Sequence, residues 1–494
     1  MEIQSCADHE LYTFSVLMLP WLAHGHVSPY LELAKRLSRQ HHILVHICST
    51  PINLNPIREH LDRNQKYNYI RLVELHLPPL PGLPPQLHTT KYLPPHLMPT
   101  LKKAFDLAEP SFCRLLDDLQ PDLLIYDFIQ PWAPLSAQSR GIPAIHFMTS
   151  GAAATSFFCH YLVKEGSFPF PFQAISLGGL HQDLQYTSML NKVVDDEVLA
   201  DRERFLHSLE CSSGFIAIKS FREIEFKYID YFSSLIGKEV MPVGPLVPDD
   251  AENVVGSEEL ERAIMRWLSK RETSSVVFVS FGSEYFMSEE EMIDLALGLE
   301  LSEASFIWVV RFPTKEQEGE EERERERERR SARELPRGFM ERVVRERGMV
   351  VEGWAPQRSI LAQQSLGAFL THCGWSSVME GMRFGVPMVA LPLHLDQPLN
   401  AKLVVELGVG VLVPSSSNDR LGGVGKFKGH DVAKGIRDVL FTKKGEGIKA
   451  KAKEMAQTMS RRDDEQEIQA MVEKMTALCS DNANKRRRPQ FATD

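Results

Sequence analysis

The chain lacks several features that would place it in other classes of protein. None of its apolar runs reaches the ~18 to 20 residues that a membrane-spanning helix needs. Its first ten residues are polar and acidic and do not resemble a secretory signal. It holds only 7 cysteines, scattered and odd in number, which favours reduced thiols over a disulfide framework. We therefore expect a cytoplasmic protein without a membrane span.

Several motifs of common enzyme classes are also missing. No two aspartates stand at Asp-x-Asp spacing, and neither H-E-x-x-H nor a zinc-type cysteine and histidine spacing occurs, so we expect no metal site. There is no G-x-G-x-x-G, which disfavours a nicotinamide enzyme. Gly425 and Lys426 could end a P-loop, but Arg420 stands where that motif begins with glycine. The net charge of −10 argues against nucleic acid as a partner.

Apolar runs alternate with amphipathic stretches along the chain, as in an α/β protein. An apolar run at 13–19, an amphipathic stretch at 27–39 and a second apolar run at 43–48 predict a βαβ unit, and the pattern returns in the second half. A chain of 494 residues is long enough for two domains of about 200 to 250 residues. We predict an N-terminal domain at 1–248, a linker at 249–260, a C-terminal domain at 261–475 and a tail at 476–494.

Two polar residues of the first half follow predicted strands. His24 lies in the loop after the first strand, at the end where open α/β sheets place ligands, and His26 reads as a helix-start residue. Asp127 ends the strand 121–126 and could hold one imidazole nitrogen while the other acts as a base. On pattern alone, a histidine at a strand end is more often structural than catalytic, and the aspartate could simply cap the next turn. The proline-rich stretch 78–99 is predicted to be a surface loop, which either borders an acceptor pocket or only connects two elements. The aromatic residues between 157 and 172 fit an acceptor pocket or, more often for such clusters, core packing.

The richest stretch of the chain runs from Trp354 to Gln397. An apolar strand at 366–370 ends at His372, and Gly374 would let the backbone approach an anion closely. Ser376 and Ser377 stand where a helix should begin, and the free N–H groups of a first helical turn bind phosphate oxygens. Further along, carboxylate and amide groups suited to ribose and sugar hydroxyls occur at Glu380, Asp396 and Gln397.

This stretch resembles, without a gap, the signature box of plant secondary-product glycosyltransferases, which use UDP-sugars. The resemblance implies a GT-B fold, two Rossmann-like domains facing across a cleft, with the last helix crossing back onto the first domain. One position departs from the family, since Ser376 stands where Asn is usual. A hydroxyl can still donate one hydrogen bond, so this departure concerns one contact rather than the activity.

The resemblance also implies a role for each matching residue. His24 would be the catalytic base, with Asp127 as its partner. In the donor site, uracil would contact Trp354, Ala355 and Gln357, and the ribose would contact Glu380. The transferred sugar would contact Asp396 and Gln397. The residues near the diphosphate would be Ser283, His372, Gly374, Trp375, Ser376 and Ser377.

We accordingly expect an inverting, metal-independent UDP-glucosyltransferase that needs no cofactor beyond UDP-glucose as donor. Three segments, at 20–26, 278–286 and 395–398, resemble the branch of the family that adds a sugar to a sugar of flavonoid or triterpenoid glycosides. The partners would be the acceptor and the UDP-sugar, and the protein a monomer. Two alternatives remain open: a glucosyltransferase that acts on an aglycone, and a UDP-sugar-binding protein without turnover. The run of Glu and Arg at 316–330 reads as a solvated insertion.

Overall fold

The computed structural model describes residues 13–41, 43–63, 67–91, 93–164, 168–188, 201–248, 258–311, 335–336, 338–414, 427–462 and 464–487. The Glu- and Arg-rich run at 316–330 and most of the predicted linker lie outside the described residues. So does the end of the tail after residue 487.

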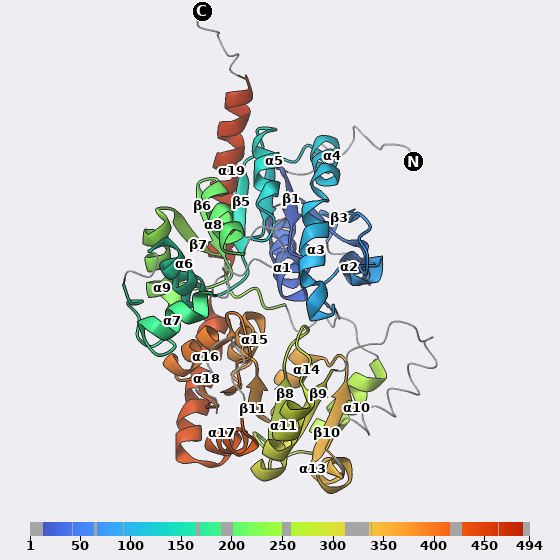
Figure 1. The fold of residues 1–494 in the computed structure, drawn as a ribbon, viewed down its shortest axis with the longest axis vertical. Coiled ribbons are helices and arrows are strands. Elements are labelled where there is room, and N and C mark those ends of the chain that lie inside the picture. The colour runs from blue at the N-terminus through green and yellow to red at the C-terminus, as the bar shows by residue number, and fades with distance from the viewer. Residues whose placement is uncertain are drawn as a thin grey trace, which may run out of the picture. The chain divides into compact units, whose positions relative to one another are not determined.

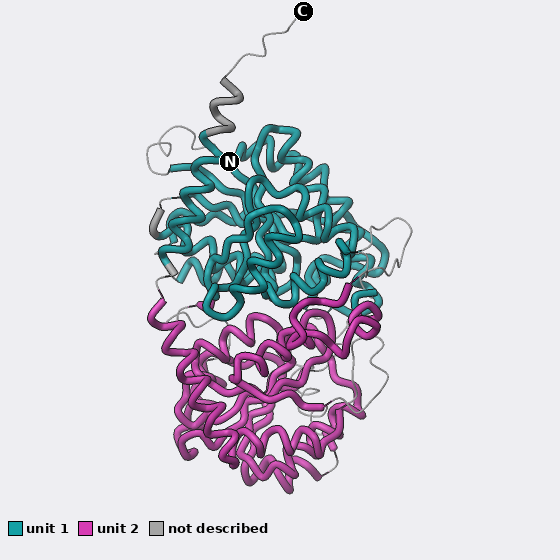
Figure 2. The backbone as a smooth tube through the Cα atoms, turned by 90° about the vertical axis from the view of Figure 1, so that its left-hand side faces the viewer, with its two compact units in different colours: residues 1–165, 187–246, 463–494 teal, residues 166–186, 247–462 magenta. Residues whose placement is uncertain are grey.

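The chain divides into two compact units (Figure 2). Unit 1 comprises residues 1–165, 187–246 and 463–494, and unit 2 comprises residues 166–186 and 247–462. Residues 166–186, which the sequence led us to place in the N-terminal domain, thus belong to the unit formed by the second half of the chain. The C-terminal segment belongs to unit 1.

The described part of unit 1 is built on a seven-stranded sheet with the order β3-β2-β1-β4-β5-β6-β7 (Figure 1). Every pairing in it is parallel. Several strands are buried along their whole length, as expected for a parallel sheet covered on both faces. The strands are β1 (Ser15–Leu19), β2 (Leu44–Ser49), β3 (Ile70–Glu74), β4 (Leu123–Tyr126), β5 (Ala144–Met148), β6 (Phe215–Ile218) and β7 (Glu239–Pro242).

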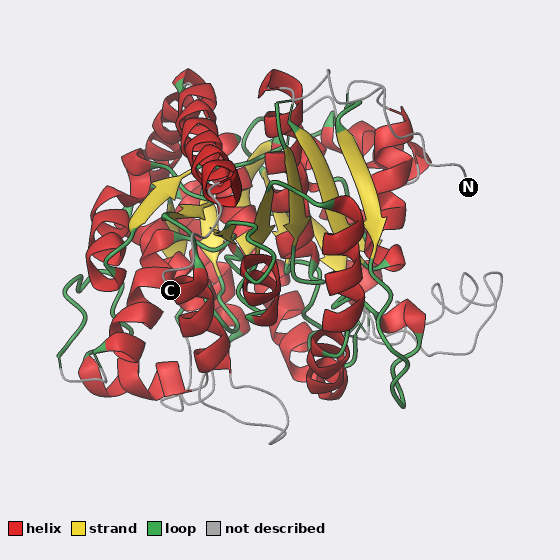
Figure 3. Ribbon diagram, turned by 90° about the horizontal axis from the view of Figure 1, so that it is seen from above, coloured by secondary structure: helices red, strands yellow, loops and turns green. Residues whose placement is uncertain are grey.

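Helices connect these strands and cover the sheet (Figure 3). The proline-rich stretch contributes two short 3₁₀ helices, η1 (Pro85–Leu87) and η2 (Pro95–Leu97), because proline cannot continue a regular helix or central strand. The α-helices of the region are α1 (His24–His41), α2 (Pro51–Arg63), α3 (Met98–Asp106), α4 (Glu109–Leu119), α5 (Trp132–Gln138), α6 (Ala152–Val163), α8 (Asp201–Cys211), α9 (Arg222–Ile236) and the C-terminal α19 (Asp464–Arg487).

The last helix packs into the core of unit 1. Its apolar residues Ile468, Met471, Val472 and Met475 recur at helical spacing and join the cluster formed by β1, α1 and their neighbours. The helix continues to Arg487, into the stretch 476–494 that we assigned to the tail. No proline interrupts the sequence from 464 until 489, so nothing in the chain breaks the helix earlier.

The described part of unit 2 holds a second parallel sheet, six strands in the order β10-β9-β8-β11-β12-β13. Its strands are β8 (Val276–Ser280), β9 (Ser305–Val310), β10 (Gly348–Glu352), β11 (Leu366–Thr371), β12 (Met388–Ala390) and β13 (Gly410–Leu412). The helices are α7 (Leu180–Thr187), α10 (Glu258–Leu268), α11 (Glu289–Ser302), the π-helical turn η4 (Met340–Val344), α13 (Arg345–Arg347), α14 (Gln357–Leu361), α15 (Trp375–Arg383), α16 (Gln397–Glu406), α17 (Gly429–Phe441) and α18 (Lys443–Arg461).

The fold class predicted from the sequence is confirmed: two α/β units, each built on a parallel sheet. In both sheets the strand order reverses once, between β1 and β4 in unit 1 and between β8 and β11 in unit 2. We call these two places the switch points. Open parallel sheets bind ligands beyond the carboxyl ends of the strands at such a point, and both lie beside predicted site residues.

Candidate functional site

The switch point of unit 1 brings together the residues that follow β1 and β4. The last residues of these strands, Leu19 and Tyr126, are paired with each other. Nδ1 of His26, in the first turn of α1, lies 2.7 Å from Oδ2 of Asp127, the residue after β4. Thr149, which follows β5, places its hydroxyl oxygen 3.0 Å from the same nitrogen. Three neighbouring strand ends thus converge on one imidazole.

The structure corrects the predicted pairing of Asp127 with His24, because the imidazole beside Asp127 belongs to His26. His24 is the first residue of α1 and its side chain is exposed. Residues two positions apart on a helix point to different sides, so the two histidines cannot share one partner in the same way.

The sequence contained a signal for His26. It begins the helical stripe that continues with Tyr30, Leu33 and Leu37, and those three side chains are fully buried. The stripe faces the sheet, whereas His24 lies outside it. Sequence reasoning also missed Thr149, which carries no pattern beyond its place after a strand.

Asp127 is held as an ionised carboxylate. It is 1% exposed, against 23% for His26. Backbone N–H groups of Trp21 and Phe128 donate to its two oxygens at 3.1 and 2.8 Å. Burial by itself would raise the pKa of Asp127, but the attraction of His26 and the hydrogen bonds from His26 and Trp21 outweigh burial and hold that pKa below its ordinary value. An Nδ1–H that donates to this carboxylate leaves Nε2 as the basic nitrogen of a neutral ring.

The switch point of unit 2 places a second histidine between two glycines. The last residues of β8 and β11, Ser280 and Thr371, are paired, and Gly282 and His372 follow them. A Cβ atom on Gly282 would lie 2.7 Å from Nε2 of His372, and one on Gly374 would lie 2.6 Å from it. Both distances are too short for a side chain, so the close approach of the ring requires glycine on both sides.

His372 is buried, and among the described residues its Nδ1 has no hydrogen-bond partner. Burial, with a smaller contribution from His394, lowers the pKa of His372 to about 3. The ring is therefore neutral near pH 7. A neutral imidazole can donate one N–H to an anionic oxygen without bringing a charge of its own.

Helix α15 starts directly after this histidine. Its N-cap is Gly374, so Ser376 and Ser377 are the second and third helical residues rather than the N-caps that we expected. The N-cap makes no side-chain hydrogen bond, and the N–H groups of a first helical turn are suited to bind an anion. Cys373 turns the chain with a positive φ of 64°, and burial raises the pKa of its thiol, so Cys373 remains a neutral packing residue.

Four predicted donor-site residues contact one another at the start of α14. Nε2 of Gln357 donates to Oε2 of Glu380 at 2.7 Å and lies 3.3 Å from Oγ of Ser377. The backbone N–H of Gln357 donates to the carbonyl of the buried Ala355 at 2.8 Å. Trp354, just before them, is half-buried. These contacts fix the Glu380 carboxylate in one orientation, as a group that receives ribose hydroxyls requires.

The loop before α16 carries the predicted sugar-binding pair. Oε1 of Gln397 accepts from the backbone N–H groups of Leu393 and His394, both at 3.0 Å, so the amide turns back onto its own loop. Oδ2 of Asp396 accepts from Nδ2 of Asn400 at 2.9 Å, and the same nitrogen donates to the carbonyl of Cys373 at 3.0 Å. Asn400, which sequence analysis did not single out, therefore links the sugar-binding loop to the turn before α15.

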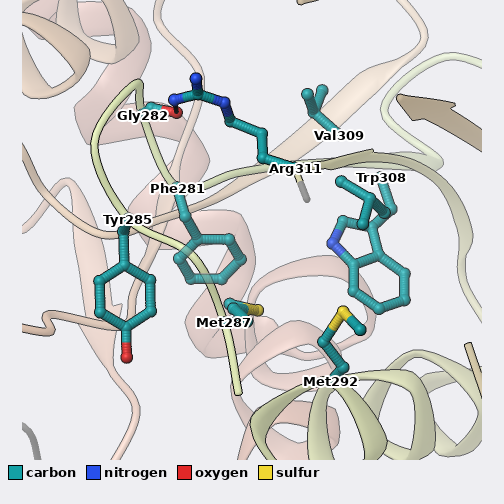
Figure 4. Close-up of a pocket in the computed structure, with 9 residues that line it drawn as sticks. Phe281, Gly282, Tyr285, Met287, Met292, Trp308, Val309 and Arg311 are labelled. Carbon is teal, nitrogen blue, oxygen red and sulfur yellow. Dashed lines mark hydrogen bonds between the residues drawn. The ribbon is translucent and has the colours of Figure 1, made fainter. Parts of the chain in front are cut away.

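A small pocket adjoins the switch point of unit 2 (Figure 4). It is lined by residues of the β8–α11 loop and of β9, including Gly282, Tyr285, Trp308 and Arg311, and its volume of about 20 Å³ has room for about one water molecule. Nη1 of Arg311 reaches the carbonyl of Gly282 at 3.4 Å. Ser283, the next residue, is half-buried. The pocket is too small for a nucleotide, but its walls support the loop that carries Gly282 and Ser283.

The described residues contain neither a cluster of metal-binding side chains nor a helix that could span a membrane. No group of three or more His, Cys, Asp or Glu side chains in the described ranges could hold a metal ion. Within the same part of the chain, no helix is both long and apolar enough to cross a membrane. The predicted aromatic cluster is divided, since Phe157 lies in α6 of unit 1 and packs on Phe158 and Tyr161, whereas Phe170 and Phe172 pack together in unit 2.

Two family models together match residues 13–418 of this chain. A family model described as "UDP-glucoronosyl and UDP-glucosyl transferase" matches residues 247–418, and one described as "Glycosyltransferase, N-terminal domain" matches residues 13–248. UDP-glucosyltransferase 29 of Panax ginseng is 44% identical over 477 residues, which are 96% of this chain and 98% of that protein.

Two further similarities cover the chain almost end to end. Beta-D-glucosyl crocetin beta-1,6-glucosyltransferase of Gardenia jasminoides is 44% identical over 465 residues, 94% of this chain and 99% of that protein. Among solved structures, UGT73P12 of Glycyrrhiza uralensis, crystallised with glycyrrhetinic acid 3-O-monoglucuronide, matches with a TM-score of 0.79 at 24% identity. That match covers 96% of this chain and 98% of the other, and it shows a shared fold.

Proposed function

Because this chain belongs to the UDP-glycosyltransferase family, we propose that it transfers glucose from UDP-glucose to a hydroxyl group of a plant specialised metabolite. The hydrogen bond between His26 and Asp127 is the observation that carries this proposal. A protein that only binds a UDP-sugar has no need of a basic imidazole oriented by a buried carboxylate, whereas glycosyl transfer to a hydroxyl group requires a group that takes the proton.

The proposed acceptor is a sugar of an existing flavonoid or triterpenoid glycoside. The name of the Gardenia jasminoides relative describes the addition of glucose to a glucosyl group, and that relative is similar over 94% of this chain. The segments at 20–26, 278–286 and 395–398, which suggested the sugar-extending branch, support the same acceptor class.

In the proposed reaction, Nε2 of His26 takes the proton of the acceptor hydroxyl as its oxygen attacks the anomeric carbon. Asp127 stabilises the imidazolium that forms, and Nδ1 stays bonded to the carboxylate throughout. The bond between the anomeric carbon and the diphosphate oxygen breaks, and UDP leaves as an anion. A single displacement of this kind inverts the anomeric centre, so an α-linked donor gives a β-glycoside.

Unit 2 supplies the proposed donor site. The N–H groups at the start of α15 and the neutral ring of His372 are placed to stabilise negative charge on the departing diphosphate. Glu380, oriented by Gln357, would receive the ribose hydroxyls, and Trp354 and Ala355 the uracil. Asp396 and Gln397 would hold the glucose. In this proposal, no metal ion or additional cofactor takes part.

We place the enzyme in the cytosol. Every cysteine in the described ranges is a free thiol, at positions 48, 113, 159, 211, 373 and 479, as is usual in a reducing compartment. We also propose that it works as a monomer, since each of the proposed catalytic and donor groups comes from one chain.

The test is UDP release from UDP-glucose, with matched aglycones and their monoglucosides as acceptors. We expect turnover on the monoglucosides, a loss of roughly 10²- to 10⁴-fold in kcat for His26→Ala, and near wild-type turnover for His24→Ala. UDP-rhamnose and UDP-glucuronate serve as competing donors.

Each alternative predicts a different result in this assay. Turnover on aglycones alone would overturn the acceptor assignment, and preference for another UDP-sugar would overturn the donor. Tight binding of UDP-glucose without product from any acceptor would favour the binding protein. Loss of activity in His24→Ala with an active His26→Ala would contradict the assignment of the base.

A further inference from the structure

The loop from Leu393 to Gln397, here called the sugar loop, has an unusual backbone at its centre. Leu395 adopts a positive φ of 56° although it is not glycine, and 51% of it is exposed. A bulky residue in this region is strained, and such a conformation persists only where surrounding contacts enforce it. Leu395 immediately precedes Asp396 and Gln397, so whatever holds its backbone also places these two side chains.

Contacts within the second half of the chain hold the two flanks of the sugar loop. Gln397 accepts from the backbone at Leu393 and His394, as described above. The His394 ring packs against Tyr285, with 5.7 Å between ring centres, and Asn400 fixes Asp396. None of these contacts reaches the carbonyl group of Leu395 itself.

The carbonyl of Leu395 accepts a hydrogen bond from the hydroxyl of Tyr186, at the end of α7. The two residues are 209 positions apart in sequence, yet both belong to unit 2 (Figure 2). Tyr186 is 6% exposed. Burial and then the charge of Asp396 raise the pKa of Tyr186, so its hydroxyl keeps the proton that it donates.

Helix α7 is itself ordered by a buried carboxylate. Asp183, 1% exposed, accepts from the hydroxyl of Ser176 at 2.9 Å and from the backbone N–H of Leu177 at 2.7 Å. The Ser176 hydroxyl also accepts from the backbone N–H of Gly179 at 3.0 Å. These contacts fix the entry to α7, so Tyr186 projects from a rigid support rather than from a loose loop.

We propose that Tyr186 is a positioning residue for the transferred sugar, which holds the strained backbone of Leu395 so that Asp396 and Gln397 face the sugar of the donor. The inference rests on the proposed function of the sugar loop. Its consequence is that a segment from the first half of the chain controls recognition of the donor sugar. In the proposed donor site, uracil, ribose and diphosphate contact residues other than Asp396 and Gln397, so Tyr186 should affect a UDP-sugar but not UDP.

The test is titration calorimetry of UDP, UDP-glucose and UDP-rhamnose with the wild-type protein and with Tyr186→Phe, which removes one hydroxyl group. We expect a Kd roughly 3- to 10-fold higher for the preferred UDP-sugar, as for the loss of one hydrogen bond, and an unchanged Kd for UDP. In turnover the KM for the donor should rise more than kcat falls. Tyr231→Phe is the matched control, because it removes a hydroxyl 2.6 Å from Nδ1 of His160 in unit 1 and should change none of these values.

Equal weakening of UDP and UDP-sugar in Tyr186→Phe would mean that Tyr186 only supports the fold, and unchanged binding of both would mean that the hydroxyl is dispensable. Either result overturns the inference alone. A wild-type protein that binds UDP but neither UDP-sugar would overturn the proposed donor together with the inference. Binding of UDP shows that each variant is folded, so an unfolded variant is recognised directly. Leu395→Gly removes the backbone strain. In the Leu395→Gly background, Tyr186→Phe should therefore leave the Kd for the UDP-sugar unchanged.

Discussion

Each switch point carries a histidine, but the two histidines follow different strands, β1 in unit 1 and β11 in unit 2, and the surroundings of the two rings differ. In unit 1, His26 is partly exposed and bonds to the ionised carboxylate of Asp127. In unit 2, His372 is buried between the backbones of Gly282 and Gly374 and has a pKa of about 3. One ring can accept a proton and be stabilised as a cation, whereas the other stays neutral.

The comparison shows that sheet topology decides where chemistry gathers and that neighbouring groups decide which chemistry it is. The strands on either side of a reversal end next to each other, and their following loops run to opposite faces of the sheet, which opens a crevice whatever the sequence. In unit 1 the carboxylate of Asp127 makes the neighbouring His26 a suitable base. In unit 2 two glycines allow close packing around His372, which keeps that ring neutral and able to donate a hydrogen bond.

The largest effect is expected at the switch point of unit 1. Asp127→Asn should lower kcat roughly 10²- to 10⁴-fold, because an amide cannot stabilise the imidazolium and can donate to Nδ1 and so favour the wrong tautomer. Steady-state kinetics with a saturating acceptor measure it. Asp122→Asn is the control, since this carboxylate lies at the other end of the same strand and accepts from Ser15. A kcat for Asp127→Asn within a few-fold of the wild type would contradict the role of the pair.

The next effect is expected where the glycines enclose His372. Gly374→Ala introduces a Cβ atom 2.6 Å from Nε2 and should raise the KM for UDP-glucose roughly 10- to 100-fold with little change in acceptor KM. Gly282→Ala adds backbone strain to a similar clash, because its φ is +74°.

Gly237→Ala separates these two causes. Gly237 has a φ of +63° but no atom within 4 Å of its Cβ position, so only strain acts there. This variant should lose about 1 kcal/mol of stability and keep its KM values. Equal KM values for Gly374→Ala and the wild type would show that the fit around His372 does not matter for the donor.

The pH dependence of stability compares one buried histidine from each unit. Burial lowers the pKa of His146 to about 4 and that of His372 to about 3. The unfolded chain therefore binds protons below its ordinary histidine pKa of about 6.5 while the folded chain does not, so stability is full above that pH and falls as the pH drops.

As the pH falls from 6.5 to 5, each of these histidines should lower the free energy of unfolding by about 2 kcal/mol. Urea unfolding at the two pH values measures the loss. In His146→Leu, the loss of unfolding free energy between the two pH values should be smaller by the contribution of one histidine, about 2 kcal/mol. An unfolding midpoint that does not move with pH would show that neither ring is held neutral in the folded protein.

The smallest effect is expected for Ser376→Asn. The change restores the residue usual at this position in plant glycosyltransferases and adds an amide donor at the start of α15. One additional hydrogen bond should lower the KM for UDP-glucose by about 2- to 5-fold without changing kcat. A rise in KM would indicate that the serine is adapted to this site.

Much of the fold could be predicted from the sequence because its signals are local. Apolar runs separated by amphipathic stretches predicted the parallel α/β sheets, and the polar residues of the stretch from Trp354 to Gln397 lie after β10, β11 and β12, in and around α14, α15 and the start of α16. The N-cap of α15 was misjudged by two positions, since glycine and serine both suit a helix start and the sequence does not say which one has helical backbone angles.

The partner of Asp127 could not be decided in the same way. His24 and His26 both follow the first strand, and either could meet a carboxylate 101 or more positions away. The choice depends on which face of α1 packs on the sheet, and the buried stripe from His26 to Leu37 makes that choice. The helical spacing of these residues is visible in the sequence. It shows which histidine meets Asp127 only once the position of β4 beside β1 is known.

By itself, the sequence determined the fold class, the places where strands end and the set of groups suited to a nucleotide sugar. It could do so because hydrophobic periodicity and helix-start chemistry act over a few residues. Only the tertiary structure decided that His26 rather than His24 meets Asp127, and that Tyr186 supports Leu395 from 209 positions away. Contacts at such separations are fixed by how whole helices and strands pack, which no short window of sequence contains.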